Sequence, residues 1–236
     1  MELPGIEVRK VERCGSTNAL LLAEAKPNVL LVAEEQTAGR GRRGRRWHSA
    51  PGAGVTFSLS AAVTRPVTGL SLVAGVATAR ALRGLGVTQA ALKWPNDLVV
   101  DGAKLGGILV ETRSALAVIG IGINCRRDPA LEKRLRRPIA ALDQFIAVDR
   151  DRVIERVAQS LVEALATFDA QGLDGLRGEW ERMHAHAGKR LRVRLADGRV
   201  LTGVARGLDG DGGLRLQTRA GVRAVRNGRI LSARPA

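Results

Sequence analysis

The chain has 236 residues, of which 45% are hydrophobic, so it can bury the core of one medium-sized domain with a small appendage. The formal net charge of +15 favours anionic partners such as nucleotides, acidic proteins or nucleic acids. Two cysteines, Cys14 and Cys125, are too few for a disulfide framework or a cysteine-based metal site. The sequence contains neither a signal peptide nor an apolar run long enough for a membrane helix, and we therefore expect a cytoplasmic protein.

The first motif is Ser16-Thr17-Asn18, at the start of a short helical run that ends before Pro27. A serine or threonine at this point is also the usual N-cap of a helix, so the motif alone is ambiguous. An apolar run predicts a buried strand at 29–33, and alternating residues predict another strand at 54–60.

Between these strands lies a segment that we call the Arg/Gly loop, residues 39–47, with five arginines, three glycines and a terminal tryptophan. Arginine supplies forked donors and glycine lets backbone amides approach closely, so the composition suits a phosphate. A solvated basic loop or a nucleic-acid arm would have the same composition. Because like charges repel, we expect the loop to be mobile until an anion binds.

The middle of the chain predicts an alanine-rich helix at 69–85 and strands at 88–93, 97–101, 105–112 and 116–124. The segment Lys93-Trp94-Pro95-Asn96-Asp97 leads into a hairpin whose second strand begins beside Lys104. In the last of these strands, Gly120 and Gly122 would admit another group close to the backbone.

The cleanest amphipathic helix is predicted at 151–168, followed by a second helix at 173–186. In the first helix we expect Val153, Val157 and Phe168 on the apolar face and Ser160 on the polar face. His184 and His186 have no third ligand nearby in the sequence, so we predict no metal site there.

After Gly188 the pattern changes to short alternating strands with glycine turns, which predicts a small β-barrel of about five strands. Residues 187–236 contain 12 basic and 3 acidic residues and no aromatic residue. Without an aromatic side chain to stack on bases, we interpret the arginines as the solvated face of the strands.

Five motifs follow one another between residues 16 and 124: Ser-Thr-Asn at 16–18, Glu-Gln-Thr-Ala-Gly-Arg-Gly-Arg at 35–42, Lys-Trp-Pro-Asn-Asp at 93–97, Lys-Leu-Gly-Gly-Ile-Leu at 104–109 and Gly-Ile-Gly-Ile-Asn at 120–124. In this order they resemble the biotin protein ligase family, and the resemblance covers roughly residues 10–235. The resemblance implies an α+β fold, with a mixed or antiparallel sheet and helices in a catalytic domain (residues 1–186) and a C-terminal SH3-like β-barrel (residues 187–236). It also implies the short form of the family, because Ser-Thr-Asn begins too early to leave room for an N-terminal DNA-binding domain.

In the family reaction the biotin carboxylate attacks the α-phosphate of ATP, which releases pyrophosphate and gives biotinyl-5'-AMP. Biotin is then transferred to a lysine of a biotin carboxyl carrier protein domain. The substrates supply both nucleophiles, so the chain needs charge neutralisation and alignment rather than a nucleophile of its own. By resemblance, the catalytic residues would be Arg42, Lys93 and Lys104. The biotin-binding residues would be Ser16, Thr17, Asn18, Gln36, Arg40, Gly41, Arg42, Lys104, Gly107, Gly120 and Gly122. The nucleotide-binding residues would be Arg40, Arg42, Trp47, Lys93, Asn96 and Asn124.

Mg²⁺ would offset the remaining phosphate charge, with Asn96 and Asp97 as the nearest oxygen donors. The expected partners are biotin, ATP and the carrier domain, with no specific DNA and no membrane, and a homodimer stays open. Two alternatives remain: a lipoate or octanoate ligase of the same superfamily, and a basic nucleic-acid-binding protein.

Overall fold

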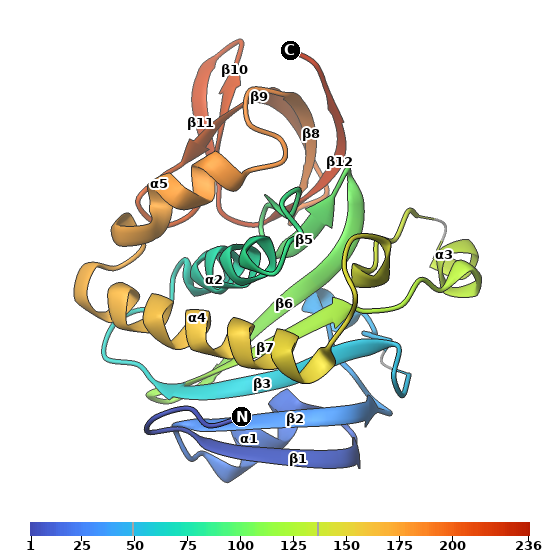
Figure 1. Ribbon diagram of the computed structural model, residues 1–236. Helices are drawn as coiled ribbons and strands as arrows, with labels where there is room; N and C mark the ends of the chain where they lie inside the picture. Colours follow the sequence, from blue (N-terminus) through green and yellow to red (C-terminus); the bar gives the residue numbers. More distant parts are fainter. Residues whose placement is uncertain (49, 136) are drawn as a thin grey trace.

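The computed structural model describes residues 1–48, 50–135 and 137–236, which form two sheets and their covering helices (Figure 1). The larger sheet has seven strands in the order β1-β2-β3-β7-β6-β5-β4. The strands are β1 (Glu7–Cys14), β2 (Val29–Gln36), β3 (Gly54–Ala62), β4 (Ala91–Lys93), β5 (Asp97–Val100), β6 (Ala103–Arg113) and β7 (Leu116–Asn124). Strands β1 and β2 are parallel and the other neighbours are antiparallel, so the sheet is mixed, as expected.

The two faces of the sheet differ because β7 alternates isoleucine with glycine. Ile119, Ile121 and Ile123 are buried in the main hydrophobic core. Side chains alternate between the faces of a strand, so Gly120 and Gly122 lie on the opposite face. There the neighbouring strand β3 places the polar residues at 56 and 58. One face therefore stabilises the fold, and the other is a shallow polar floor on which another group can rest.

The core face of the sheet is covered by α2 (Leu70–Gly84), α4 (Arg150–Gln171) and α5 (Asp174–Met183). Helix α1 (Thr17–Glu24) lies on the other face, against β2, β3, β6 and β7 (Figure 1). Ser16 is the N-cap of α1, and its hydroxyl accepts from the backbone amide of Ala19 at 3.4 Å. Among the described residues, no helix combines the length and apolarity that crossing a bilayer would require.

The second sheet is antiparallel, with the order β11-β10-β9-β8-β12. Its strands are β8 (Arg190–Leu195), β9 (Val200–Leu208), β10 (Leu214–Thr218), β11 (Gly221–Val225) and β12 (Gly228–Arg234). In β8 Leu191 and Val193 are buried and the alternating arginines are exposed, so the basic side chains form one face of the strand, as expected. Its apolar residues join the same hydrophobic core as the larger sheet. The α+β fold with a small C-terminal β-structure is confirmed.

Three local expectations need correction. Strand β1 and the short helix α3 (Pro129–Leu135) were not predicted, because neither contains a buried side chain and neither therefore shows an apolar pattern. Ser160 was expected on the polar face of the helix at 151–168, but it is buried. Its position three residues after Val157 and four before Ala164 continues the apolar face at helical spacing, so the expectation was wrong.

Helix α5 ends beside two imidazoles at the boundary between the two sheets, those of buried His184 and half-buried His186. The ring of His184 lies 4.5 Å from that of Trp180, and 5.9 Å from that of His186. Neither ring nitrogen of His184 has a hydrogen-bond partner among the described residues. Burial lowers the pKa of His184 to about 3, and His186 and Lys189 add repulsion in the same direction. The pKa of His186 falls to about 4 for the same main reason.

These imidazoles make the fold sensitive to acid. The unfolded chain takes up a proton near pH 6.5, whereas folded His184 stays neutral down to about pH 3. Between these values the unfolded state binds more protons, so the free energy of unfolding falls as the pH drops, by roughly 1.4 kcal/mol per pH unit for His184. Denaturant titrations between pH 7 and 4.5 measure this slope. We expect His184→Phe to flatten this slope more than His48→Phe does, because burial and Arg134 also lower the pKa of His48, but less than burial lowers that of His184. A His184→Phe protein with the wild-type slope would contradict the assignment.

Candidate active site

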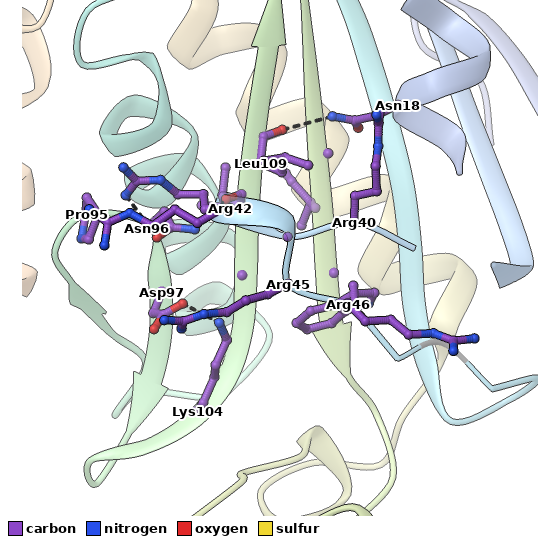
Figure 2. A pocket seen from close by; sticks show the side chains of 18 of the residues that line it. Asn18, Arg40, Arg42, Arg45, Arg46, Pro95, Asn96, Asp97, Lys104 and Leu109 are labelled. Carbon is purple, nitrogen blue, oxygen red and sulfur yellow. Dashed lines mark hydrogen bonds and ion pairs between the residues drawn. The ribbon is translucent and has the colours of Figure 1, made fainter. Parts of the chain in front are cut away.

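A cavity of about 290 Å³ opens on the glycine face of the larger sheet, beneath the Arg/Gly loop (Figure 2). Its walls are the start of α1, strands β3, β6 and β7, the segment before β5 and the start of β12. The predicted site residues that line it are Ser16, Thr17, Asn18, Gln36, Arg40, Gly41, Arg42, Trp47, Lys93, Asn96, Asp97, Lys104, Gly107, Gly120 and Gly122. Segments up to 106 residues apart in the sequence thus meet in one place, and only Asn124 of the predicted set lies elsewhere.

One end of the cavity is a buried network of neutral polar groups. The Gln36 amide oxygen accepts from the backbone amide of Thr17 at 2.7 Å and from its hydroxyl at 3.1 Å. The Thr17 and Ser58 hydroxyls are 2.6 Å apart, and Ser58 donates to the Asn18 amide oxygen at 2.6 Å. These four side chains are each at least nine-tenths buried, so their positions are held firmly by one another. We call them the neutral end.

A carboxylate connects the neutral end to the Arg/Gly loop. The Asn18 amide group donates to Glu111 at 2.9 Å. It also donates to the carbonyl oxygen of Leu109 at 3.2 Å (Figure 2). The same oxygen of Glu111 accepts from the Arg40 guanidinium at 3.2 Å. Arg40 therefore has a charged protein partner, and its position depends on the residues that surround the neutral end.

Cationic side chains gather at the opposite end of the cavity (Figure 2). The Lys104 ammonium, whose side chain is only 17% exposed, forms an ion pair with Asp97. Burial lowers the pKa of Lys104, and Asp97 opposes that shift. Lys93 pairs with Asp97 in the β4–β5 register, and its charge also acts on Lys104. We call this part the cationic end; an anion arriving here would meet positive charge that is already desolvated.

Asn96 and Arg42 meet between the two ends. The Asn96 amide group donates to the carbonyl oxygen of Ile108 at 2.7 Å, which turns its oxygen towards the cavity. That oxygen accepts from Arg42 at 3.4 Å (Figure 2). The guanidinium of Arg42 is half-buried; burial lowers its pKa, Arg43 adds repulsion, and Asp97 acts in the opposite direction. Arg42 therefore carries a charge that its surroundings compensate only in part.

The backbone of the Arg/Gly loop has a defined turn. The Trp47 amide donates to the Gly39 carbonyl at 2.9 Å, and the Gly41 amide donates to the Arg45 carbonyl at 2.6 Å. At the tip, Arg42–Gly44 forms a short 3-10 turn, η1, in which Arg43 has a φ of 58°. This left-handed conformation is uncommon for a residue with a Cβ. The expected mobility of the ligand-free loop stays a prediction.

The glycine floor is occupied by two side chains of the protein. A Cβ on Gly122 would lie 2.7 Å from the Trp47 indole nitrogen and closer still to its ring carbons. A Cβ on Gly120 would overlap the amide oxygen of Asn18 and approach its Cγ to 3.0 Å. The Trp47 ring also has the Lys104 ammonium 5.8 Å from its centroid. The glycines thus determine where the indole and the amide lie, in addition to leaving room for a ligand.

Trp94 contributes to packing, as expected. It is buried in the core, and its indole N–H donates to the carbonyl oxygen of Gly212 in the C-terminal sheet at 3.0 Å.

Asn124 lines a second cavity, of about 310 Å³, that shares Gln36, Arg46, Trp47 and Thr56 with the first. Its amide group donates to the carbonyl oxygens of Lys104 at 3.1 Å and Ala140 at 3.0 Å. In this structure Asn124 therefore holds the segment after β7 against β6, and Trp47 lines both cavities.

Sequence reasoning missed several residues of the site. Ser58 could have been found, because the polar residues at 56, 58 and 60 alternate along a strand beside the Arg/Gly loop. Glu111 has no such signal, because its role depends on the register of β6 with β7. Arg137 and residues 228–231 also line the cavity, although they are distant in the sequence.

Comparisons with known proteins agree with this architecture. Residues 10–126 match the Biotin/lipoate A/B protein ligase family, and residues 186–231 match the Biotin protein ligase C terminal domain. A biotin--[acetyl-CoA-carboxylase] ligase of Mycobacterium tuberculosis is 36% identical over 219 residues, covering 87% of this chain and 81% of the relative. The bifunctional ligase/repressor BirA of Escherichia coli is 34% identical over 228 residues, covering 92% of this chain and 71% of that protein.

Among solved structures, the biotin protein ligase of Aquifex aeolicus in complex with biotin and ATP superimposes with a TM-score of 0.85 at 28% identity, covering 98% of this chain and 99% of that one. The matches therefore extend over both sheets and over every motif that lines the cavity. The chain belongs to the biotin protein ligases of the biotin/lipoate A/B protein ligase family.

Proposed function

We propose that this protein activates biotin with ATP to form biotinyl-5'-AMP and transfers the biotinyl group to one lysine of a biotin carboxyl carrier protein domain. The observation that carries the proposal is the polarity of the cavity, with the neutral end and the cationic end in one space of about 290 Å³. Biotin has the same polarity, because its ureido group is neutral and its carboxylate is charged.

At the neutral end, the ureido group would replace some of the internal hydrogen bonds. Its carbonyl accepts and its two N–H groups donate, which matches the hydroxyl and amide side chains of Ser16, Thr17, Asn18 and Gln36. Because these residues already hold one another in place, little side-chain entropy is lost when the ligand binds. Gly120 leaves room for the Asn18 amide and Gly107 for the Lys104 side chain, so both glycines position binding groups.

At the cationic end, the carboxylate of biotin and the α-phosphate of ATP must approach each other although both are negative. Arg40, Arg42, Lys93 and Lys104 would reduce that repulsion and align the attack, with the Gly41 amide as a further donor. Lys104 would exchange its contact with Asp97 for the reacting anions. The indole of Trp47 would stack against the adenine, with Asn96 beside the phosphates and Asn124 in the adjoining cavity.

Mg²⁺ would neutralise the remaining phosphate charge. The oxygen of Asn96 faces the cavity and Asp97 supplies a carboxylate, so the oxygen donors suit a hard cation. The described residues contain no cluster of three or more acidic, histidine or cysteine ligands, so the phosphates and water would complete the coordination.

The second half-reaction needs only the carrier lysine. It attacks the carbonyl carbon of the mixed anhydride, an amide bond forms, and AMP leaves as the C–O bond to the phosphate breaks. The positive charge around the cavity would favour an acidic carrier surface and stabilise the departing phosphate.

A lipoate or octanoate substrate is the main alternative within the family. An acyl chain ending in a dithiolane or methyl group would form no hydrogen bond with the neutral end, whereas the ureido group of biotin would. The buried Thr17–Gln36–Ser58 contacts therefore favour biotin. Binding of nucleic acid rests on the net charge alone.

The decisive experiment mixes the protein with ATP, Mg²⁺, biotin and a carrier domain, and then weighs the carrier. We expect one biotinyl group on one lysine, no addition without ATP, and none on a carrier whose acceptor lysine is replaced by arginine. Lipoate in place of biotin should leave the carrier unmodified. A carrier modified by lipoate and not by biotin would assign the chain to the alternative, and operator-specific nanomolar DNA binding at physiological salt would support the nucleic-acid reading.

A further inference from the structure

The C-terminal sheet reaches the Arg/Gly loop through one side chain. Asn227 lies in the turn between β11 and β12, immediately before the residues of β12 that line the cavity. Its amide oxygen accepts from the Arg43 guanidinium at 2.8 Å and from the Arg42 guanidinium at 3.4 Å. A neutral oxygen of the C-terminal sheet thus binds two neighbouring arginines in the loop between β2 and β3 of the larger sheet.

The surroundings of this contact make it specific. Arg43 reaches Asn227 from a left-handed backbone conformation, which its own side chain disfavours. Arg42 divides its donors between Asn227 and Asn96, so both of its acceptors are uncharged amides. Gly228 is required next to Asn227, because a Cβ there would lie 2.9 Å from a Val193 methyl and 3.0 Å from the Arg194 carbonyl. The turn therefore has little freedom to move the amide elsewhere.

The neutrality of Asn227 determines what it can do. A carboxylate at this position would neutralise Arg42 and Arg43 and compete with an incoming phosphate. An amide satisfies their hydrogen bonds and leaves their charge uncompensated. Burial and the nearby Arg43 already disfavour the charge on Arg42, so an arriving polyphosphate removes an unfavourable interaction.

We propose that Asn227 is a positioning residue of the C-terminal sheet: it holds Arg42 and Arg43 over the cavity and releases them to the phosphates of ATP. The inference rests on the proposed function for its last step only, because the contact itself is made between residues of the chain. It predicts that the charge at residue 227 determines whether Arg42 and Arg43 bind this residue or bind the phosphates of ATP.

The experiment compares wild type with Asn227→Ala, Asn227→Asp and, as a control amide on the same sheet, Gln217→Ala. Gln217 is exposed on β10, and its amide group donates to the neighbouring carbonyl of Thr218. Limited trypsinolysis without ligand, read by mass, measures how well Arg42 and Arg43 are held. We expect cleavage at these residues to rise ~5-fold in Asn227→Ala and to fall by a similar factor in Asn227→Asp.

Exchange of pyrophosphate into ATP, dependent on biotin, gives the second readout. We expect Asn227→Asp to raise the KM for ATP ~5-fold with little change in kcat or in the KM for biotin, and added salt to reduce this effect. If Asn227 had only a structural role, its substitution would change kcat and the melting temperature. The effect would then be the same for the neutral alanine and the negatively charged aspartate. Gln217→Ala should behave as wild type in both assays.

Equal trypsin cleavage of all four proteins would overturn the proposal, and so would equal changes in Asn227→Ala and Asn227→Asp. If the cleavage rates diverge as expected while wild type catalyses no exchange, the contact stands and the proposed function fails. If exchange proceeds normally and KM for ATP is insensitive to residue 227, the function stands and the release of the arginines to ATP is wrong.

Discussion

Lys104→Ala is expected to slow formation of biotinyl-5'-AMP on the order of 10²-fold or more, the loss typical of removing one preorganised donor. The Lys104 ammonium is desolvated on the cavity wall, paired with Asp97 and 5.8 Å from the centroid of the Trp47 ring. Its charge is therefore in place before the carboxylate and phosphate arrive. Removing Lys104 ends the cost of burying its charge but leaves Asp97 without its ion-pair partner, so the two effects on the melting temperature oppose each other and the rate should change far more than the stability.

Pyrophosphate exchange under saturating biotin and ATP measures this rate, and calorimetry with biotin alone separates binding from chemistry. Lys26→Ala is the matched control, because Lys26 forms an exposed ion pair with Glu7 at 2.5 Å, away from the cavity. A Lys104→Ala protein within threefold of the wild-type rate, with an unchanged melting temperature, would remove Lys104 from the reacting site.

Gly120→Ala and Gly122→Ala should affect the KM values of different substrates, although the two residues lie only two positions apart on one strand. A Cβ at Gly120 would displace the Asn18 amide, so the KM for biotin should rise. A Cβ at Gly122 would displace the Trp47 indole, so the KM for ATP should rise. We expect about 10-fold in each case, the value of one buried hydrogen bond or one aromatic contact.

A double-mutant cycle tests the second assignment. If Gly122 matters because of the indole, then adding Gly122→Ala to Trp47→Ala should have little further effect. Gly106→Ala is the contrasting control: its Cβ would lie 2.7 Å from the Gly122 carbonyl oxygen in the adjacent strand, so it should lower the melting temperature. If Gly120→Ala and Gly122→Ala raised the two KM values alike, the two ends of the cavity would not be distinct.

The sequence predicted those parts of the fold in which a single periodicity dominates. An apolar run located β2, alternation located β3, and helical spacing located α4 to within a few residues. The charged edge strand β1 was missed, because its stability comes from pairing with β2 and from few buried side chains of its own. Ser160 was misplaced because a serine has no apolar signal, although its spacing was that of the buried face.

The residues of the candidate site also fall into those that the sequence could predict and those that it could not. Residues within the five motifs could be named, because each motif keeps its chemistry within a few positions. Glu111 and Asn227 could not, because each acts on an arginine 71 or 184 residues away, and only the packed strands bring them together. Asn124 lies within a motif, yet the structure directs its amide to two backbone carbonyls. A motif thus identifies a residue that matters without specifying which group it contacts.

The hydrophobic core runs from the larger sheet into the C-terminal sheet, so neither sheet should unfold without the other. Leu191, Leu214 and Ile230 pack in the same cluster as the strands beneath the cavity. Melting should therefore be one cooperative transition, and cutting the chain after residue 186 should yield an aggregating fragment rather than a weakened enzyme. We expect a single peak in calorimetry of the intact chain. Catalytic activity should be lost at the same temperature at which the strands of the C-terminal sheet unfold.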